Sequence, residues 1–259
     1  MFSGAAPALG AEGSEGIHVT LKPYILGSVA GMPITATMVT AWLTMTILIV
    51  GALVLRPRIA LIPRKAQSMV ELVVGGAYNY MAEVLESKER ARFYFPVVMT
   101  IFLFILAMNW LGLFPGVTSI GFYDAEHNFT PLLYPSATDL NITIAFAIIA
   151  FVTIEVAGIL AIGVWRYAGK FVNFSSPIAF AVGIIELISE LARLISFSFR
   201  LFGNIFSGKT LLLVVMFLAT PYVLPVPLIA YEFFVGFIQA FIFAILTLYF
   251  IKLATEEPH

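Results

Sequence analysis

The sequence predicts an all-α polytopic membrane protein with about five membrane helices, an interfacial amphipathic helix, and a long, strongly tilted hairpin formed by the last two membrane helices. Hydrophobic residues make up 61% of the 259 residues and charged residues 11%, whereas soluble domains have roughly 45–50% and about 25%. Apolar stretches long enough to cross the ~30 Å core of a bilayer recur along the chain. Lysine and arginine concentrate in one loop, as they do on the cytoplasmic side of membrane proteins.

We expect all 259 residues to form a single membrane domain. Residues 1–30 are expected to be an exposed tail, because the chain starts with small, polar and acidic residues. The first membrane helix is predicted at residues 32–55. The basic loop that follows, residues 56–94, carries half of the fourteen lysines and arginines. Within it, apolar residues at helical spacing between residues 66 and 90 predict an amphipathic interfacial helix.

Three further membrane helices are predicted at residues 95–114, 142–165 and 228–251. The stretch 177–219 differs, because it stays helical in pattern for about 43 residues with no proline inside, which is about 60 Å of helix. That is twice the length of a perpendicular span, so this helix either breaks in two or lies steeply tilted. The turn residues Thr220–Pro225 predict that it forms a hairpin with the last helix.

The positive-inside rule orients these helices. The basic loop 56–94 is then cytoplasmic, which puts the N-terminus outside and the C-terminus in the cytoplasm. Residues 115–139 contain no lysine or arginine and carry three acids, Asp124, Glu126 and Asp139. We therefore expect this segment to be an outer loop.

Several function classes are excluded by the composition and the motifs. A net charge of −1 argues against nucleic-acid binding, and the absence of cysteine excludes disulfides and catalytic thiols. The three histidines are too scattered for a metal site, and no cofactor or catalytic chemistry is expected. Residues Gly203–Thr210 match the P-loop pattern, but they lie inside an apolar helix and no strand-like run precedes them.

Polar residues form one stripe along the predicted helix 177–219. With Arg200 as reference, the side chains within about 40° of it on a helical projection are Glu186, Ser189, Arg193, Ser196, Asn204 and Ser207. In one interpretation this edge packs against other helices, and Glu186 or Glu190 pairs with Arg193. Arg200 is still left without an acid on its own helix, and an unpaired guanidinium at the membrane centre costs at least about 2.5–3.5 kcal/mol. We therefore expect another helix or another chain to supply a carboxylate.

The last predicted helix carries a shorter polar edge, on which Glu232, Gly236 and Gln239 lie within about 40° of one another. Two interpretations remain open here. Gln239 can make an interhelical hydrogen bond by itself, or Glu232, near the outer turn, can be the first group that meets an incoming proton.

The chain resembles subunit a of F-type ATP synthases. The residues that carry the resemblance are the run Ser196-Phe-Ser-Phe-Arg200-Leu-Phe-Gly-Asn204-Ile-Phe-Ser-Gly, the later Gln239-Ala-Phe-Ile-Phe, and shorter matches that begin at Gly31, Met108 and Pro135. The resemblance implies a stator subunit with two half-channels for protons, facing a rotating ring of small hairpin subunits that carry carboxylates. It also implies contact with peripheral-stalk subunits and an indirect link to the catalytic sector. It favours a bacterial plasma membrane and leaves a mitochondrial inner membrane as the alternative.

The resemblance also assigns roles to single residues. Arg200 matches the arginine that meets the ring carboxylates, Asn204 and Gln239 match its polar neighbours, and Glu186 and Ser196 match residues of the proton path. Glu232 matches a position of the outer half-channel, and Asp139 is a candidate for the point at which protons enter.

One position departs from the family. Lys209 stands where many members have an acid or a histidine, and two hypotheses account for it: a buried ion pair with Glu232, or an ammonium that reaches the outer interface.

Two other functions are weighed against the stator. A secondary transporter would use Arg200 to bind an anionic substrate, and a purely structural scaffold would not depend on Arg200 for ion flux.

Overall fold

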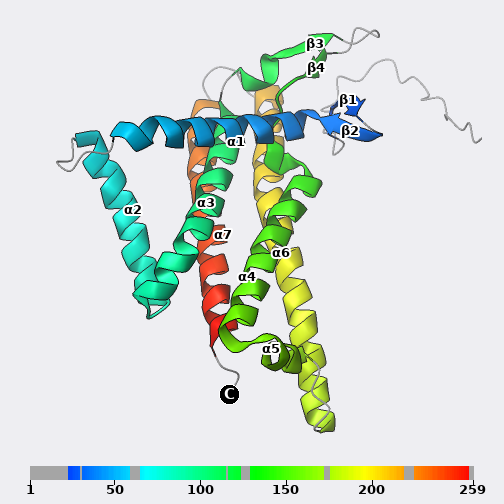
Figure 1. Cartoon of the computed structure of the whole chain (residues 1–259). Coiled ribbons are helices and arrows are strands. Elements are labelled where there is room, and N and C mark those ends of the chain that lie inside the picture. Colours follow the sequence, from blue (N-terminus) through cyan, green and yellow to red (C-terminus); the bar gives the residue numbers. More distant parts are fainter. Residues whose placement is uncertain are drawn as a thin grey trace, which may run out of the picture.

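The computed structural model describes residues 23–29, 31–58, 65–114, 116–123, 129–171, 176–218 and 225–256. In this part the chain forms seven α-helices and two short antiparallel hairpins (Figure 1). Four helices are long and apolar enough to cross a membrane: α1 (Ala36–Leu55), α3 (Lys88–Leu113), α4 (Leu140–Ile162) and α7 (Pro225–Thr255). The predicted class, an all-α polytopic membrane protein, is confirmed.

The stretch that carries the polar stripe is one unbroken helix, α6 (Pro177–Leu218), of 42 residues. Of the two alternatives for this stretch, a break in the helix is therefore wrong. α6 carries five charged residues and is not among the four apolar helices named above. α6 packs along α7, as the predicted hairpin requires, while the turn at residues 220–225 lies largely outside the described residues.

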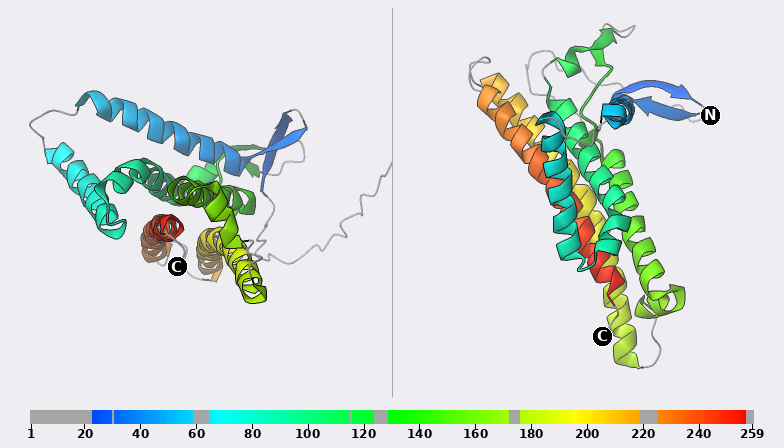
Figure 2. Two further views of the ribbon diagram at one scale, coloured as in Figure 1. Left: turned by 60° about the horizontal axis from the view of Figure 1, so that its bottom comes forward. Right: turned by 60° about the vertical axis from the view of Figure 1, so that its left-hand side comes forward.

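The helices form three layers. Figures 1 and 2 show α1 lying crosswise over one end of the bundle, with α3 and α4 between it and the α6–α7 pair. The core lies between α3, α4, α6 and α7, where side chains such as Ile105, Met108, Leu201 and Phe243 are almost wholly buried. Because α1 and α6 are crosswise, these two helices cannot both run along the membrane normal.

Several predicted boundaries are wrong for local reasons. The predicted interfacial helix forms as α2 (Lys65–Val84), and its side chains Met69 and Leu72 are 72% and 76% exposed. α3 then begins seven residues before its predicted start, because the Ser87 side chain accepts a hydrogen bond from the Arg90 amide and caps the helix. α4 ends at Ile162, since Gly163 has a φ of +90° that a helix does not continue, and a short helix α5 (Val164–Phe171) follows.

The two hairpins were not predicted. Strands β1 (Ile25–Val29) and β2 (Met32–Thr35) occupy residues that we expected to be tail and helix, and the turn between them contains Gly31 with a φ of +83°. In the outer loop, β3 (Gly121–Tyr123) pairs with β4 (Phe129–Pro131). Their shortness explains the miss, because strands of three to five residues carry almost no periodic pattern.

Candidate functional site

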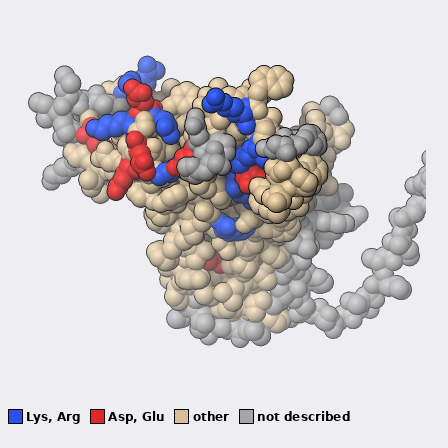
Figure 3. Space-filling view, turned by 90° about the horizontal axis from the view of Figure 1, so that it is seen from below, with Lys and Arg blue, Asp and Glu red and all other residues tan. Residues whose placement is uncertain are grey.

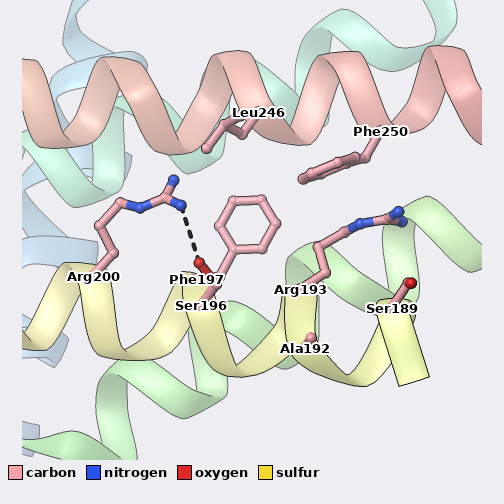
Figure 4. Close-up of a pocket in the computed structure, with 8 residues that line it drawn as sticks. All are labelled: Ser189, Ala192, Arg193, Ser196, Phe197, Arg200, Leu246 and Phe250. Atoms are coloured by element: carbon pink, nitrogen blue, oxygen red, sulfur yellow. Dashed lines mark hydrogen bonds between the residues drawn. The ribbon is translucent and has the colours of Figure 1, made fainter. Parts of the chain in front are cut away.

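Arg200 lies half-buried on α6, where its Nη2 donates a hydrogen bond to the Ser196 hydroxyl at 3.0 Å. It lines a cavity of about 290 Å³ between α6 and α7, together with Ser189, Arg193 and Phe250 (Figure 4). No carboxylate of the described residues lies within 4 Å of its guanidinium, so its charge is uncompensated within this part of the chain.

The charges below Arg200 neutralise one another. Arg193 Nη1 lies 2.5 Å from Glu190 Oε2, and its guanidinium stacks over the Phe250 ring at 3.9 Å. Lys170, on α5, lies 2.6 Å from Glu186 and 3.6 Å from Glu190. The sequence left open whether Glu186 or Glu190 pairs with Arg193, and the structure gives that place to Glu190. Two cations thus meet two carboxylates, and none of these acids is left for Arg200.

Polar residues above Arg200 join α6 to α7. The Asn204 amide donates a hydrogen bond to Gln239 Oε1, and Gln239 is almost wholly buried. Gln239 Nε2 has no hydrogen-bond partner among the described residues. One turn of α6 after Arg200, the two helices are therefore linked by a pair of neutral amides, one of which still has a free donor.

A second cavity of about 350 Å³ lies beyond this amide pair. Asn204, Ser207, Gly208 and Glu232 line it, and it shares no lining residue with the cavity at Arg200. Glu232 is buried, and a Cβ atom on Gly208 would lie only 3.2 Å from its carboxyl. The absence of a side chain at position 208 therefore gives the Glu232 carboxyl its place against α6.

Gly236, also on the polar edge of α7, serves packing between helices. Its carbonyl accepts a hydrogen bond from the buried Asn109 amide of α3 at 3.1 Å, and a Cβ at position 236 would lie 3.2 Å from the Asn109 Cβ. The close approach that a glycine permits is used here by another helix.

Lys209 fulfils neither of the two hypotheses for it. Its Nζ is buried, lies 3.1 Å from the centre of the Tyr134 ring, and makes no ion pair with Glu232 among the described residues. Burial raises the pKa of Tyr134 to about 12, so the ring stays a neutral phenol. Lys209 projects from a different face of α6 than Gly208, toward Tyr134 in the loop before α4, although its charge still acts on Glu232 from a distance.

Asp139 is buried at the start of α4. Its Oδ1 accepts from the Asn141 amide at 2.9 Å and caps the helix, and its Oδ2 accepts from the Thr37 hydroxyl of α1 at 2.7 Å. Through these hydrogen bonds, Asp139 joins the start of α4 to α1. Its suggested part in admitting protons stays a prediction.

The interpretation of the P-loop pattern can be compared directly with the structure. Residues Gly203–Thr210 lie within α6, so the P-loop pattern has no strand and loop to hold phosphates, as expected. Sequence reasoning overlooked Glu155, a single acid inside the apolar helix α4, and Tyr167 on α5, whose hydroxyl is buried. The rarity of acids in membrane helices was a signal that could have found Glu155.

Comparison with known proteins identifies the family. The family profile described as ATP synthase A chain matches residues 38–252. The chain belongs to this family. It is 34% identical to ATP synthase subunit a of Geobacter sp. strain M21, over 85% of this chain and 88% of that protein. It is also 32% identical to ATP synthase subunit a of Moorella thermoacetica, over 89% and 95%, and 33% identical to ATP synthase subunit a 3 of Pelobacter propionicus, over 95% and 96%.

The resemblance found in the sequence is thereby confirmed. Membership in the ATP synthase A chain family makes this chain a membrane-sector subunit of an ATP synthase, working with other subunits in ATP synthesis and ion transport. The apolar helices and the bacterial relatives support an integral membrane protein.

Proposed function

We propose that this chain is the stator subunit that forms two proton half-channels, one on each side of Arg200, against a rotating ring of carboxylate-bearing hairpin subunits. The observation that carries the proposal is the pair of cavities along the α6–α7 seam, which share no lining residue. The Asn204–Gln239 hydrogen bond lies between them. A proton could therefore reach the region of Arg200 from either side without a continuous path through the chain.

The electrostatics of Arg200 support a partner on another chain. A guanidinium does not lose its proton in proteins, so burial in the membrane requires an anion. The described acids near it are used by Lys170 and Arg193. A carboxylate that arrives on the ring would meet a fixed positive charge, release its proton into one half-channel, and take up another from the second after it has moved on.

We assign the cavity at Arg200 to the inner half-channel and the cavity at Glu232 to the outer one. Glu186, Ser196 and the stripe between them lead to the first, while Glu232, Ser207 and Asn204 line the second. Lys209 lies outside both cavities, over Tyr134. It would act on the outer path through its charge alone.

The arrangement of the helices fits a stator. If the apolar helix α1 crosses the membrane, α6 lies steeply tilted, since the two helices are crosswise (Figures 1 and 2). α6 also bears exposed apolar side chains such as Leu191, Ile195 and Phe199. A tilted helix with such a face can follow the curved surface of a ring.

The orientation we propose puts the C-terminus in the cytoplasm and the N-terminus outside, in a bacterial plasma membrane. Basic and acidic side chains gather at the end of the molecule where α6 begins, beside a wide uncharged surface (Figure 3). The peripheral stalk and, through it, the catalytic sector would contact the chain on its cytoplasmic side.

Single cysteines test the two half-channels, because the natural chain has none. Ser189→Cys should react with a membrane-impermeant thiol reagent added from the cytoplasmic side, and Ser207→Cys with the same reagent added from outside. Ile195→Cys, on the exposed apolar face of α6, is the control and should stay unlabelled. Labelling of positions 189 and 207 from the same side would contradict two separate half-channels.

A further inference from the structure

A carboxyl outside the polar stripe lies at the inner end of the bundle. Glu155 Oε1, on α4, is buried and has no hydrogen-bond partner among the described residues, and the same holds for the hydroxyl of Tyr167 on α5. Only 4% of the surface of Tyr167 is exposed. The two groups interact electrostatically with each other. The carboxyl and the hydroxyl thus act on each other across one buried space.

The backbone is built to bring Tyr167 to this place. A Cβ atom on Gly158, one turn after Glu155, would lie 2.9 Å from the Tyr167 Cζ atom, so only glycine leaves room for the ring on α4. Tyr167 is on the short helix that folds back after Gly163. The turn at Gly163 and the gap at Gly158 together place the phenol beside Glu155.

The neighbouring charges leave no cation for Glu155. The charged groups that act on it are Lys170 on α5 and Glu190 and Arg193 on α6. Lys170 is held by Glu186 and Glu190, and Arg193 by Glu190, so these two cations and two carboxylates balance. On α7, Lys252 pairs with Glu86. Glu155 forms a cluster with Lys170, Arg193, Glu186 and Glu190. The cluster has a net charge of −1 when Glu155 is ionised and is neutral when Glu155 is protonated.

The exposure of the acidic side chains in this cluster falls from the inner surface toward the cavity at Arg200. The side chain of Glu186 is 33% exposed and that of Glu190 only 3%. Glu190 binds Arg193, which lines the cavity that also contains Arg200. Glu155 and Tyr167 thus sit beside the connection between the inner surface and that cavity.

We propose that Glu155 is a proton-exchange site of the inner half-channel and that Tyr167 is its positioning residue. Hydronium at the inner surface gives its proton to the Glu155 carboxylate and leaves as water. The carboxylic acid then passes the proton to water in the cavity at Arg193, which restores the carboxylate. The negative charge left on the cluster attracts the next proton from the inner side. This assignment rests on the proposed stator function and adds a residue to its inner path.

The test uses the complete ATP synthase in inverted membrane vesicles, where the cytoplasmic side faces the medium. Glu155→Gln keeps the shape of the side chain but cannot exchange a proton, and we expect it to lower ATP-driven proton pumping at least about tenfold. Glu155→Asp should recover a large part of the rate. Tyr167→Phe should keep substantial pumping but shift its dependence on the pH of the medium, because the carboxyl loses its neighbouring hydroxyl. Glu83→Gln, an exposed acid on α2, is the matched control.

The outcomes separate the inference from the proposed function. If Arg200→Ala stops pumping but Glu155→Gln pumps at the rate and with the pH dependence of the wild type, Glu155 has no part in the path and the stator function stands. If Arg200→Ala pumps normally, the stator function itself fails. If Glu155→Gln does not assemble, the pH profiles of Glu155→Asp and Tyr167→Phe decide, and profiles equal to that of the wild type would overturn the inference.

Discussion

The Nζ atom of Lys209 lies 3.1 Å from the centre of the Tyr134 ring, and the ion pair with Glu232 is not formed. Lys209 does not line the cavity that contains Glu232. Its ammonium group lies against an aromatic ring in the loop before α4.

We therefore expect Lys209→Met to keep ATP-driven proton pumping within about twofold of the wild-type rate, because methionine fills similar space without a buried charge. Tyr134→Leu should be the more harmful change, since it leaves the ammonium buried without the ring and forfeits an interaction worth about 0.5–2 kcal/mol. Pumping and thermal stability of the purified complex measure the two effects. A larger pumping defect in Lys209→Met with normal assembly would show that Lys209 takes part in the outer path by more than its distant charge.

Gly208 offers a second test, because the Glu232 carboxyl packs directly against it. In Gly208→Ala the new methyl group must displace that carboxyl by a few tenths of an ångström, and we expect slower pumping with normal assembly. Gly51→Ala on α1 is the control, since a Cβ there has nothing within 4 Å. Equal rates for both variants would show that the position of Glu232 does not matter.

Asp139 and Thr37 hold α1 across the bundle. Thr37→Val removes the donor to Asp139 Oδ2 and should lower stability by about 1.5–3 kcal/mol, the range for hydrogen bonds to charged groups. Asp139→Asn keeps an oxygen for the helix cap, so we expect a smaller loss and near-normal pumping. Thermal unfolding in detergent measures both. A severe pumping defect in a well-assembled Asp139→Asn variant would instead support its suggested part in proton uptake.

The sequence predicts the helices of this protein well and their contacts poorly. The length of α6, its polar stripe and the isolation of Arg200 follow from composition and helical periodicity, which depend only on nearby residues. The partner of Lys209 does not, because Tyr134 is 75 positions away and in a loop. For the same reason the hydrogen bond from Thr37 to Asp139, which are 102 positions apart, could not be foreseen. A charge, a length and a periodicity are local properties, whereas a contact depends on how elements distant in the chain meet.

Glu86 gives a prediction on pH. Its hydrogen bond from Lys252 lowers the pKa of the Glu86 carboxyl below 4.5. A carboxyl with a lowered pKa in the folded state stabilises the fold above its unfolded pKa, and this contribution disappears as the pH falls through the folded value. Glu86→Gln should therefore lower the melting temperature slightly at pH 7 and not at all near pH 3. High salt should also weaken the difference, because the pair is exposed. An effect independent of pH would contradict the ion pair.

Arg200 is the centre of the account, and its removal in the intact ATP synthase is the most direct test. Arg200→Ala, with normal amounts of the chain and the ring in the membrane, should reduce ATP-driven proton pumping in inverted vesicles to background, because no fixed charge remains to release protons from the ring carboxylates. Pumping at the wild-type rate in this variant would contradict the account.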